Sequence, residues 1–226
     1  MVLLASSPEA AEGRGSGFEV RGPFAVSEDE GSLPVADLEY TRITGAERRT
    51  TRFVSTGIRA FVEVDGTVQE LDADQVEPLR VRGDEGDVGL EGLALRTWLE
   101  EPRLAPATTV DGVASERIDG AADPVAALND LVALSAQFGV SGDDLPRLDG
   151  EGAEQVRRAA QASTVDLLTG TDDRLLRHLE LIIELGPSGA GEELRTALGD
   201  LGGARLRFTL DVAAVNQPVS VDAPAE

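Results

Sequence analysis

The strongest constraint on the fold is an alternation of apolar and polar residues that recurs along the chain. Successive side chains of a strand point to opposite faces of a sheet, so this pattern predicts strands with one face on a core and one in water. Two late segments carry the clearest apolar phases, which are Leu179, Leu181, Ile183 and Leu185, followed by Leu206, Phe208, Leu210 and Val212. Half-buried strands of this kind are typical of antiparallel sheets.

Asp-Gly pairs separate two sets of these alternating segments. Asp65-Gly66 and Asp111-Gly112 each stand between apolar-alternating runs, and both central residues of a type I′ turn need a positive φ. We therefore expect a β-hairpin at each pair. Two earlier strands are also expected, each with four apolar residues on one face. These are Phe18, Val20, Phe24 and Val26 in the first, and Ile58, Ala60, Val62 and Val64 in the second.

Helical signals are fewer and lie between the strands. Asp123-Pro124 supplies an N-cap and a first-turn proline, and apolar residues recur at helical spacing until Gly139. A second helix is expected over 150–161, with short helical turns at 72–79 and 97–99. These elements predict an α+β fold with a single antiparallel sheet and helices packed on one face. Residues 1–17 are expected to be a flexible lead-in and residues 18–226 a single domain.

Composition excludes several classes of function. The 226 residues include 42 acidic side chains and 20 basic ones, all of them arginine, for a net charge of -22. Such a chain should be repelled by nucleic acid. The absence of lysine removes P-loop and Schiff-base chemistry, and the absence of cysteine removes disulfides and thiolate metal sites.

Catalytic and metal-binding patterns are also lacking. The single histidine, His178, falls in the outward phase of a predicted strand, where a solvated residue is the simpler interpretation. The acidic clusters fall in predicted loops and none has the spacing of an EF-hand. We expect no catalytic residue, no metal and no cofactor. Paired carboxylates in an envelope enzyme are a weaker alternative.

The predicted interior is mainly aliphatic, since aromatic residues make up 4% of the chain. The inward residues of the two late strands are expected to face Val125, Leu128, Leu131 and Val132 of the 124–138 helix. Sequence leaves open whether these side chains pack as a core or line a cavity.

An ordered set of motifs adds a resemblance. Residues 53–66, FVSTGIRAFVEVDG, and 109–113, TVDGV, look like two hairpins of actinobacterial envelope lipoproteins. Residues 95–103, LRTWLEEPR, resemble their R-x-W-L-x-x-P segment, and residues 164–177, TVDLLTGTDDRLLR, are similar to a later hairpin. The family is the LppX/LprG-type lipoproteins (LppX_LprAFG), related in fold to LolA, LolB and RseB. The likeness covers residues 18–224, and the chain departs from it by lacking a lipobox cysteine.

The resemblance implies a LolA-like half-barrel, in which a single curved antiparallel sheet wraps over a few helices on its concave face and encloses an apolar cavity. It also implies export to the cell envelope, either periplasmic or membrane-anchored. The expected function is an extracytoplasmic lipid carrier that holds acyl chains of a lipid, glycolipid or lipoprotein. The cavity would be lined by the inward residues named above, with Trp98 and Leu99 at its rim, although an ordinary buried anchor is an equal interpretation of Trp98. A membrane or an envelope protein would be the partner. The alternative is an RseB-like interaction or sensor module without lipid transfer.

Overall fold

The chain forms two compact units in a computed structural model that describes residues 1–6, 15–26, 29, 31–80, 93–137, 147–186 and 203–225. Unit 1 comprises Met1, Ser16–Asp87 and Ala214–Glu226, and unit 2 comprises Val2–Gly15 and Val88–Ala213. Residues from both ends of the chain are distributed between the two units, and the expectation of one domain over 18–226 stays a prediction. Each unit is described by itself.

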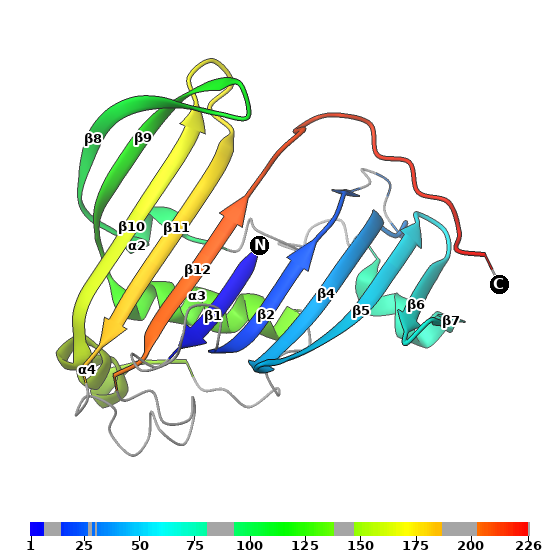
Figure 1. The fold of residues 1–226 in the computed structure, drawn as a ribbon, viewed down its shortest axis with the longest axis horizontal. Helices are drawn as coiled ribbons and strands as arrows, with labels where there is room; N and C mark the ends of the chain where they lie inside the picture. Colours follow the sequence, from blue (N-terminus) through cyan, green and yellow to red (C-terminus); the bar gives the residue numbers. More distant parts are fainter. Residues whose placement is uncertain are drawn as a thin grey trace. The chain divides into compact units, whose positions relative to one another are not determined.

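Unit 1 is an antiparallel sheet with a little helix (Figure 1). Its strands, in the order β7-β6-β5-β4-β2 with β3 on β4, are β2 (Gly15–Arg21), β3 (Phe24–Ala25), β4 (Val35–Gly45), β5 (Glu47–Thr56), β6 (Ala60–Val64) and β7 (Thr67–Glu70). The helix α1 (Ala73–Val76) and the 3-10 turn η1 (Glu77–Leu79) follow. Asp65 and Gly66 have φ values of 50° and 77°, which confirms the hairpin predicted between β6 and β7.

The core of unit 1 brings the helical turns onto the end of the sheet. Leu33, Ala60 and Val76 are buried together, and Phe53, Leu71 and Leu79 pack against them. The side chain of Gln75 returns to the backbone N–H of Asp72, closing a capping box that begins α1. This cluster fixes the β5–β7 end of the unit.

The first strand of unit 1 is broken where the sequence predicts continuity. Gly22 has a φ of 135°, and a Cβ there would stand 1.9 Å from a carbonyl oxygen of β4. The chain turns at this glycine, so Phe18 and Val20 are buried while Phe24 and Val26 are 53% and 59% exposed. The expectation that all four residues share one buried face is therefore wrong for Phe24 and Val26.

Unit 2 combines an antiparallel sheet with a layer of helices. Its strands, in the order β1-β12-β11-β10-β9-β8, are β1 (Val2–Ser6), β8 (Leu99–Val110), β9 (Val113–Ala122), β10 (Ala160–Gly170), β11 (Leu176–Leu185) and β12 (Arg205–Asp211). Its helices are α2 (Leu95–Trp98), α3 (Pro124–Gln137) and α4 (Gly150–Ala159). Positive φ values of 49° and 81° at Asp111 and Gly112 confirm the second hairpin.

The start of the chain is a strand and not a flexible lead-in. Val2 pairs with Thr209 and Ser6 with Arg205, so β1 completes one edge of β12. The short apolar run Val2–Ala5 gains sheet hydrogen bonds from a partner about 200 residues later in the chain, which no local pattern reveals. Residues 7–14 lie outside the described part.

Helix α3 begins as the sequence predicts. The Oδ1 atom of Asp123 accepts hydrogen bonds from the backbone N–H groups of Val125 at 2.8 Å and Ala126 at 3.2 Å, which satisfies two donors of the first turn. Pro124 is the first helical residue. The expected stop at Gly139, and Phe138 before it, lie outside the described residues.

Candidate ligand-binding site

The predicted apolar face of the two late strands forms in unit 2. Register pairs place Leu179 opposite Leu210, Leu181 opposite Phe208 and Ile183 opposite Leu206, so these side chains share one face. Together with Leu185 they are between 0% and 9% exposed. Val212 follows the end of β12 and is half-buried. The sheet thus offers a continuous aliphatic surface across β11 and β12.

Helix α2 contacts that face and α3 contacts α2, and both helices lie behind the strands in Figure 1. The indole of Trp98 in α2 meets the ring of Phe208 in β12 edge-on, with ring centroids 6.4 Å apart and an interplanar angle of 73°. The indole Nε1 donates to Oδ2 of Asp130 in α3 at 2.7 Å. On α3, Val125, Leu128 and Leu131 are buried and Val132 is half-buried. The predicted helix and strand residues therefore belong to one unit with a largely buried apolar interior.

Trp98 does not occupy an exposed rim. Its side chain is fully buried, at 0% exposure, because its ring packs on Phe208 while its N–H is satisfied by Asp130. Leu99, the first residue of β8, is half-buried. The anchor interpretation of Trp98 is the one that the structure supports.

Polar contacts join the helical layer within itself. Oδ2 of Asp130 also accepts from the backbone N–H of Ala94 at 2.8 Å. The Asn129 side chain accepts from the backbone N–H of Leu148 at 2.7 Å and donates to its carbonyl at 3.1 Å. Among the described side chains of these helices, at residues 95–98 and 124–134, none forms a hydrogen bond with β10, β11 or β12. The contact of this layer with the strands at Trp98 and Phe208 is apolar.

Ser163 is a polar exception on the apolar face, and sequence reasoning missed it. It lies opposite Ile183 in register, and its buried Oγ has no hydrogen-bond partner among the described residues. A buried hydroxyl without a partner costs free energy. The sequence signal for it is its position in the alternation of β10, since it shares a face with Val165 and Leu167.

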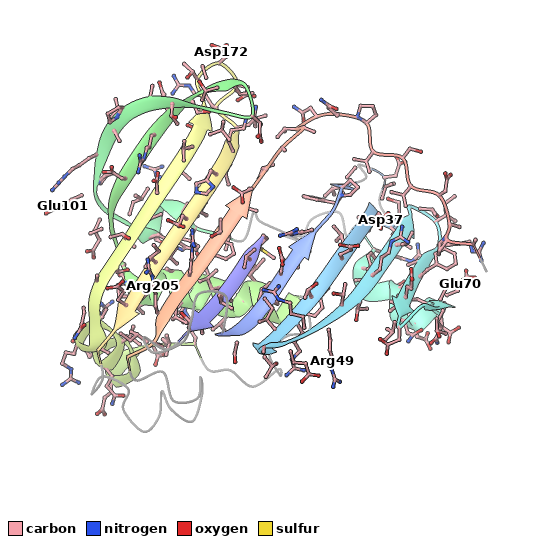
Figure 2. The ribbon with its side chains drawn as sticks, in the orientation of Figure 1. Asp37, Arg49, Glu70, Glu101, Asp172 and Arg205 are labelled. Carbon is pink, nitrogen blue, oxygen red and sulfur yellow. The ribbon has the colours of Figure 1, made fainter. Side chains whose placement is uncertain are left out.

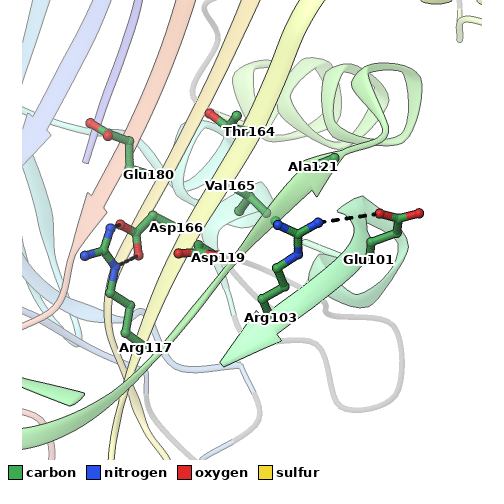
Figure 3. A pocket seen from close by; sticks show the side chains of 10 residues that line it. Glu101, Arg103, Arg117, Asp119, Ala121, Thr164, Val165, Asp166 and Glu180 are labelled. Atoms are coloured by element: carbon green, nitrogen blue, oxygen red, sulfur yellow. Dashed lines mark hydrogen bonds and ion pairs between the residues drawn. The ribbon is translucent and has the colours of Figure 1, made fainter. Parts of the chain in front are cut away.

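The other face of the sheet carries a polar hollow of about 380 Å³ (Figure 3). It forms where the pairing of β8 with β9 shifts between Glu100 and Arg103, opposite the small residues Gly120 and Ala121. Glu101 at this irregularity has a φ of 49°. Such shifts open a sheet locally and redirect its side chains.

Ion pairs occupy this hollow. Arg117 donates to both carboxylate oxygens of Asp166, at 3.0 and 2.6 Å, and this contact raises the pKa of Arg117. Glu180 accepts from Nε of Arg207 at 2.7 Å, while Arg103 and Glu101 stand 3.9 Å apart. Charged walls of this kind are a poor environment for a hydrocarbon chain. No group of three or more potential metal ligands occurs among the described residues.

His178 lies on this polar face, as its outward phase predicts. Its Nδ1 is 2.6 Å from Oδ1 of Asp211, its register partner. Its side chain keeps about a quarter of its surface exposed, at 26%. This single pair at a sheet surface provides neither a nucleophile nor a third group of a catalytic triad.

Comparison with known proteins gives structural likenesses only. No family model matches the chain, and no curated protein matches it. Among solved structures, LprF from Mycobacterium bovis is similar with a TM-score of 0.42 and 11% identity, over 100% of this chain and 89% of that one. The Mycobacterium tuberculosis lipoprotein LppX is similar with a TM-score of 0.38 and 14% identity, over 92% of this chain and 88% of that one.

None of the described helices combines the length and the apolar character that crossing a bilayer requires.

Proposed function

We propose that this protein is a lipid-binding carrier of the cell envelope that holds acyl chains between the sheet and the helical layer of unit 2. The ligand would be a lipid, a glycolipid or the acyl chain of a lipoprotein. The observation that carries the proposal is the contact of Trp98 in α2 with Phe208 on the buried apolar face of β11 and β12, which no hydrogen bond from a described side chain of α2 or α3 crosses. The proposed function involves no catalytic step.

An acyl chain can enter between the helices and the strands because few polar contacts oppose the separation of these two layers. The side chains of this face are buried without ligand, so binding would require α2 and α3 to move away from the strands. Each methylene taken from water then contributes about 0.8 kcal/mol, which offsets the contacts that are lost on opening. Contacts among Asp130, Trp98 and Ala94 would remain intact, since they lie within the moving layer.

Ser163 supports the same site. Its unpartnered hydroxyl on the apolar face can donate to a carbonyl or carboxylate oxygen of a bound lipid. Such a contact would remove the cost of burying the hydroxyl and would favour ligands that carry an ester or acid group near the chain.

Strand addition by a partner protein, which the interaction-module alternative could use, is disfavoured at β8. This strand ends the sheet of unit 2. It contains Pro102 and Pro106, which lack a backbone N–H, and its pairing shifts twice. Prolines and bulges are the usual means by which an edge strand resists pairing.

A matched pair of variants tests the carrier proposal. Leu210→Gln places an amide on the apolar face, and Ile182→Gln makes the same kind of change at a β11 position on the opposite face. We expect the first to weaken binding of a fluorescent fatty acid at least about tenfold, the equivalent of roughly two lost methylenes. The second should bind as the wild type does, and thermal melting checks that both variants are folded.

Native mass spectrometry of the purified wild-type chain provides a second measurement. The proposal predicts additional mass from co-purified or added lipid that is released on unfolding. Equal uptake by both folded variants would remove this layer as the site. An empty wild-type chain that binds no fatty acid would reject the function.

A further inference from the structure

The hairpin formed by β4 and β5 in unit 1 carries a local excess of positive charge in a strongly acidic chain. Residues 41–50 contain Arg42, Arg48 and Arg49 against the single acidic residue Glu47, a net charge of +2, whereas the whole chain has -22. All three arginines are exposed. Figure 2 labels Arg49 at the end of this hairpin.

The register of the hairpin places two of these charges against each other. Arg42 and Arg49 are direct cross-strand partners, an arrangement that destabilises a sheet when the charges are alike. Arg49 contacts Glu47 at 2.7 Å and Arg48 lies 3.7 Å from Glu19 of β2, whereas Arg42 forms no ion pair with a described residue. Folding stability alone does not account for this pair.

The basic tip, defined here as Arg42, Arg48 and Arg49, also extends beyond its neighbour on one side. The pairing of β5 with β6 ends at Thr51 and Val64, so the preceding residues of β5 have no partner in β6. Four residues of strand span roughly 13 Å. The Debye length at physiological salt is about 8 Å. Charged residues more than these four positions away from the tip therefore interact only weakly with a surface that touches the tip.

We infer that the basic tip docks the protein on an anionic lipid bilayer. A flat, negatively charged surface can contact the part of β5 that extends beyond β6, while β6 and β7 with their acidic residues stay farther away. A polynucleotide or an acidic polypeptide follows the protein surface, where the remaining charge opposes it. Arginines close to an anionic membrane attract it additively. This docking does not require the acyl site, and vesicle binding is measured separately from fatty-acid uptake.

The test is co-sedimentation of the full chain with vesicles of phosphatidylcholine, with and without phosphatidylglycerol. We expect binding only to the anionic vesicles and a decline with added sodium chloride. The variant Arg42→Gln, Arg48→Gln, Arg49→Gln should bind more weakly by about fivefold for each arginine removed. Replacement of the same three by lysine should restore binding, because the attraction depends on charge.

The matched control is Arg158→Gln, Arg174→Gln, Arg205→Gln, which removes the same charge from exposed positions of unit 2. It should bind anionic vesicles within about twofold of the wild type, the range expected for exposed charges elsewhere. The melting temperature of the glutamine tip variant should equal or exceed that of the wild type, because the repulsion between Arg42 and Arg49 is removed.

Three results would overturn the inference. One is equal vesicle binding by the wild type and the glutamine tip variant. Another is an equal loss in the unit 2 control, which would indicate general electrostatics. The third is an absence of binding to any vesicle. If the tip then bound double-stranded DNA or polyglutamate instead, the partner would be a polyanion and not a membrane.

Discussion

At the scale of single residues, the best-defined polar contact of unit 1 is the pair of Asp37 and Arg52. Arg52 donates from Nε to Oδ1 at 2.7 Å and from Nη2 to Oδ2 at 2.8 Å. This two-point contact holds the pKa of Asp37 below its ordinary value and raises the pKa of Arg52. Glu63 adds a longer contact to Arg52, at 3.4 Å. The cluster links β4, β5 and β6.

The pair makes stability depend on pH. Because the folded pKa of Asp37 is depressed, its contribution is fully present above the ordinary value of 3.8 and is lost as pH falls through the folded pKa. Asp37→Asn should therefore lower the free energy of unfolding at pH 7, by up to about 1 kcal/mol since partial exposure screens the pair. The difference from the wild type should shrink in acid below that value.

Urea unfolding at neutral pH and in acid measures this effect. The control is Glu47→Gln, which removes a more exposed carboxylate beside Arg49 and should change stability little at either pH. A gap between Asp37→Asn and the wild type that stays constant with pH would show that ionisation of Asp37 is not its cause.

At the scale of elements, α2 and α3 are held together by one carboxylate. Oδ2 of Asp130 accepts from the Trp98 indole and from the backbone N–H of Ala94. Asp130→Ala leaves a fully buried indole N–H without its acceptor, so we expect a loss of about 2 kcal/mol in unfolding free energy. Trp98 is the only tryptophan, and its fluorescence reports the transition directly.

A comparison with Asp172→Ala separates this effect from a general loss of charge. Asp172 lies in the exposed turn after β10, labelled in Figure 2, and its replacement should leave the unfolding midpoint and the emission of Trp98 unchanged. Equal stability of the two variants would mean that Asp130 does not secure the indole.

Elements set by local chemistry were predictable from the sequence, and those set by distant partners were not. Both Asp-Gly hairpins and the start of α3 at Asp123-Pro124 depend on adjacent residues, and all three are confirmed. The strand β1 and the break at Gly22 depend on contacts with β12 and β4. Neither leaves a local pattern that distinguishes it from a flexible run or a continuous strand.

The candidate site divides in the same way. Alternation predicted the inward side chains of β11 and β12, because phase within a strand is a local property. Burial of Trp98 depends on Asp130, 32 residues away, and on Phe208. The unpartnered hydroxyl of Ser163 becomes significant only when the packing around it is known. Whether the buried residues part to admit a ligand stays a proposal.

At the scale of the whole molecule, charge and apolar surface are separated. The acidic side chains give the chain its charge of -22, but the aliphatic interior of unit 2 excludes them. Basic residues gather at the β4–β5 hairpin of unit 1. A lipid carrier needs both an interior that takes hydrocarbon and an exterior that reaches a membrane without adhering along its whole surface. This distribution of residues is suited to both requirements.

The carrier proposal predicts that the helical layer opens without unfolding the sheet. Hydrogen–deuterium exchange of the full chain should show faster exchange in α2 and α3 than in β11, since the layer meets the strands in an apolar contact at Trp98 and Phe208 and opens at a lower free energy. A bound fatty acid should slow exchange in α3, because it stabilises the closed layer by mass action. Exchange of α3 and β11 at one common rate, unchanged by fatty acid, would show that the layer does not part from the sheet on its own and that the acyl chain has no entrance there.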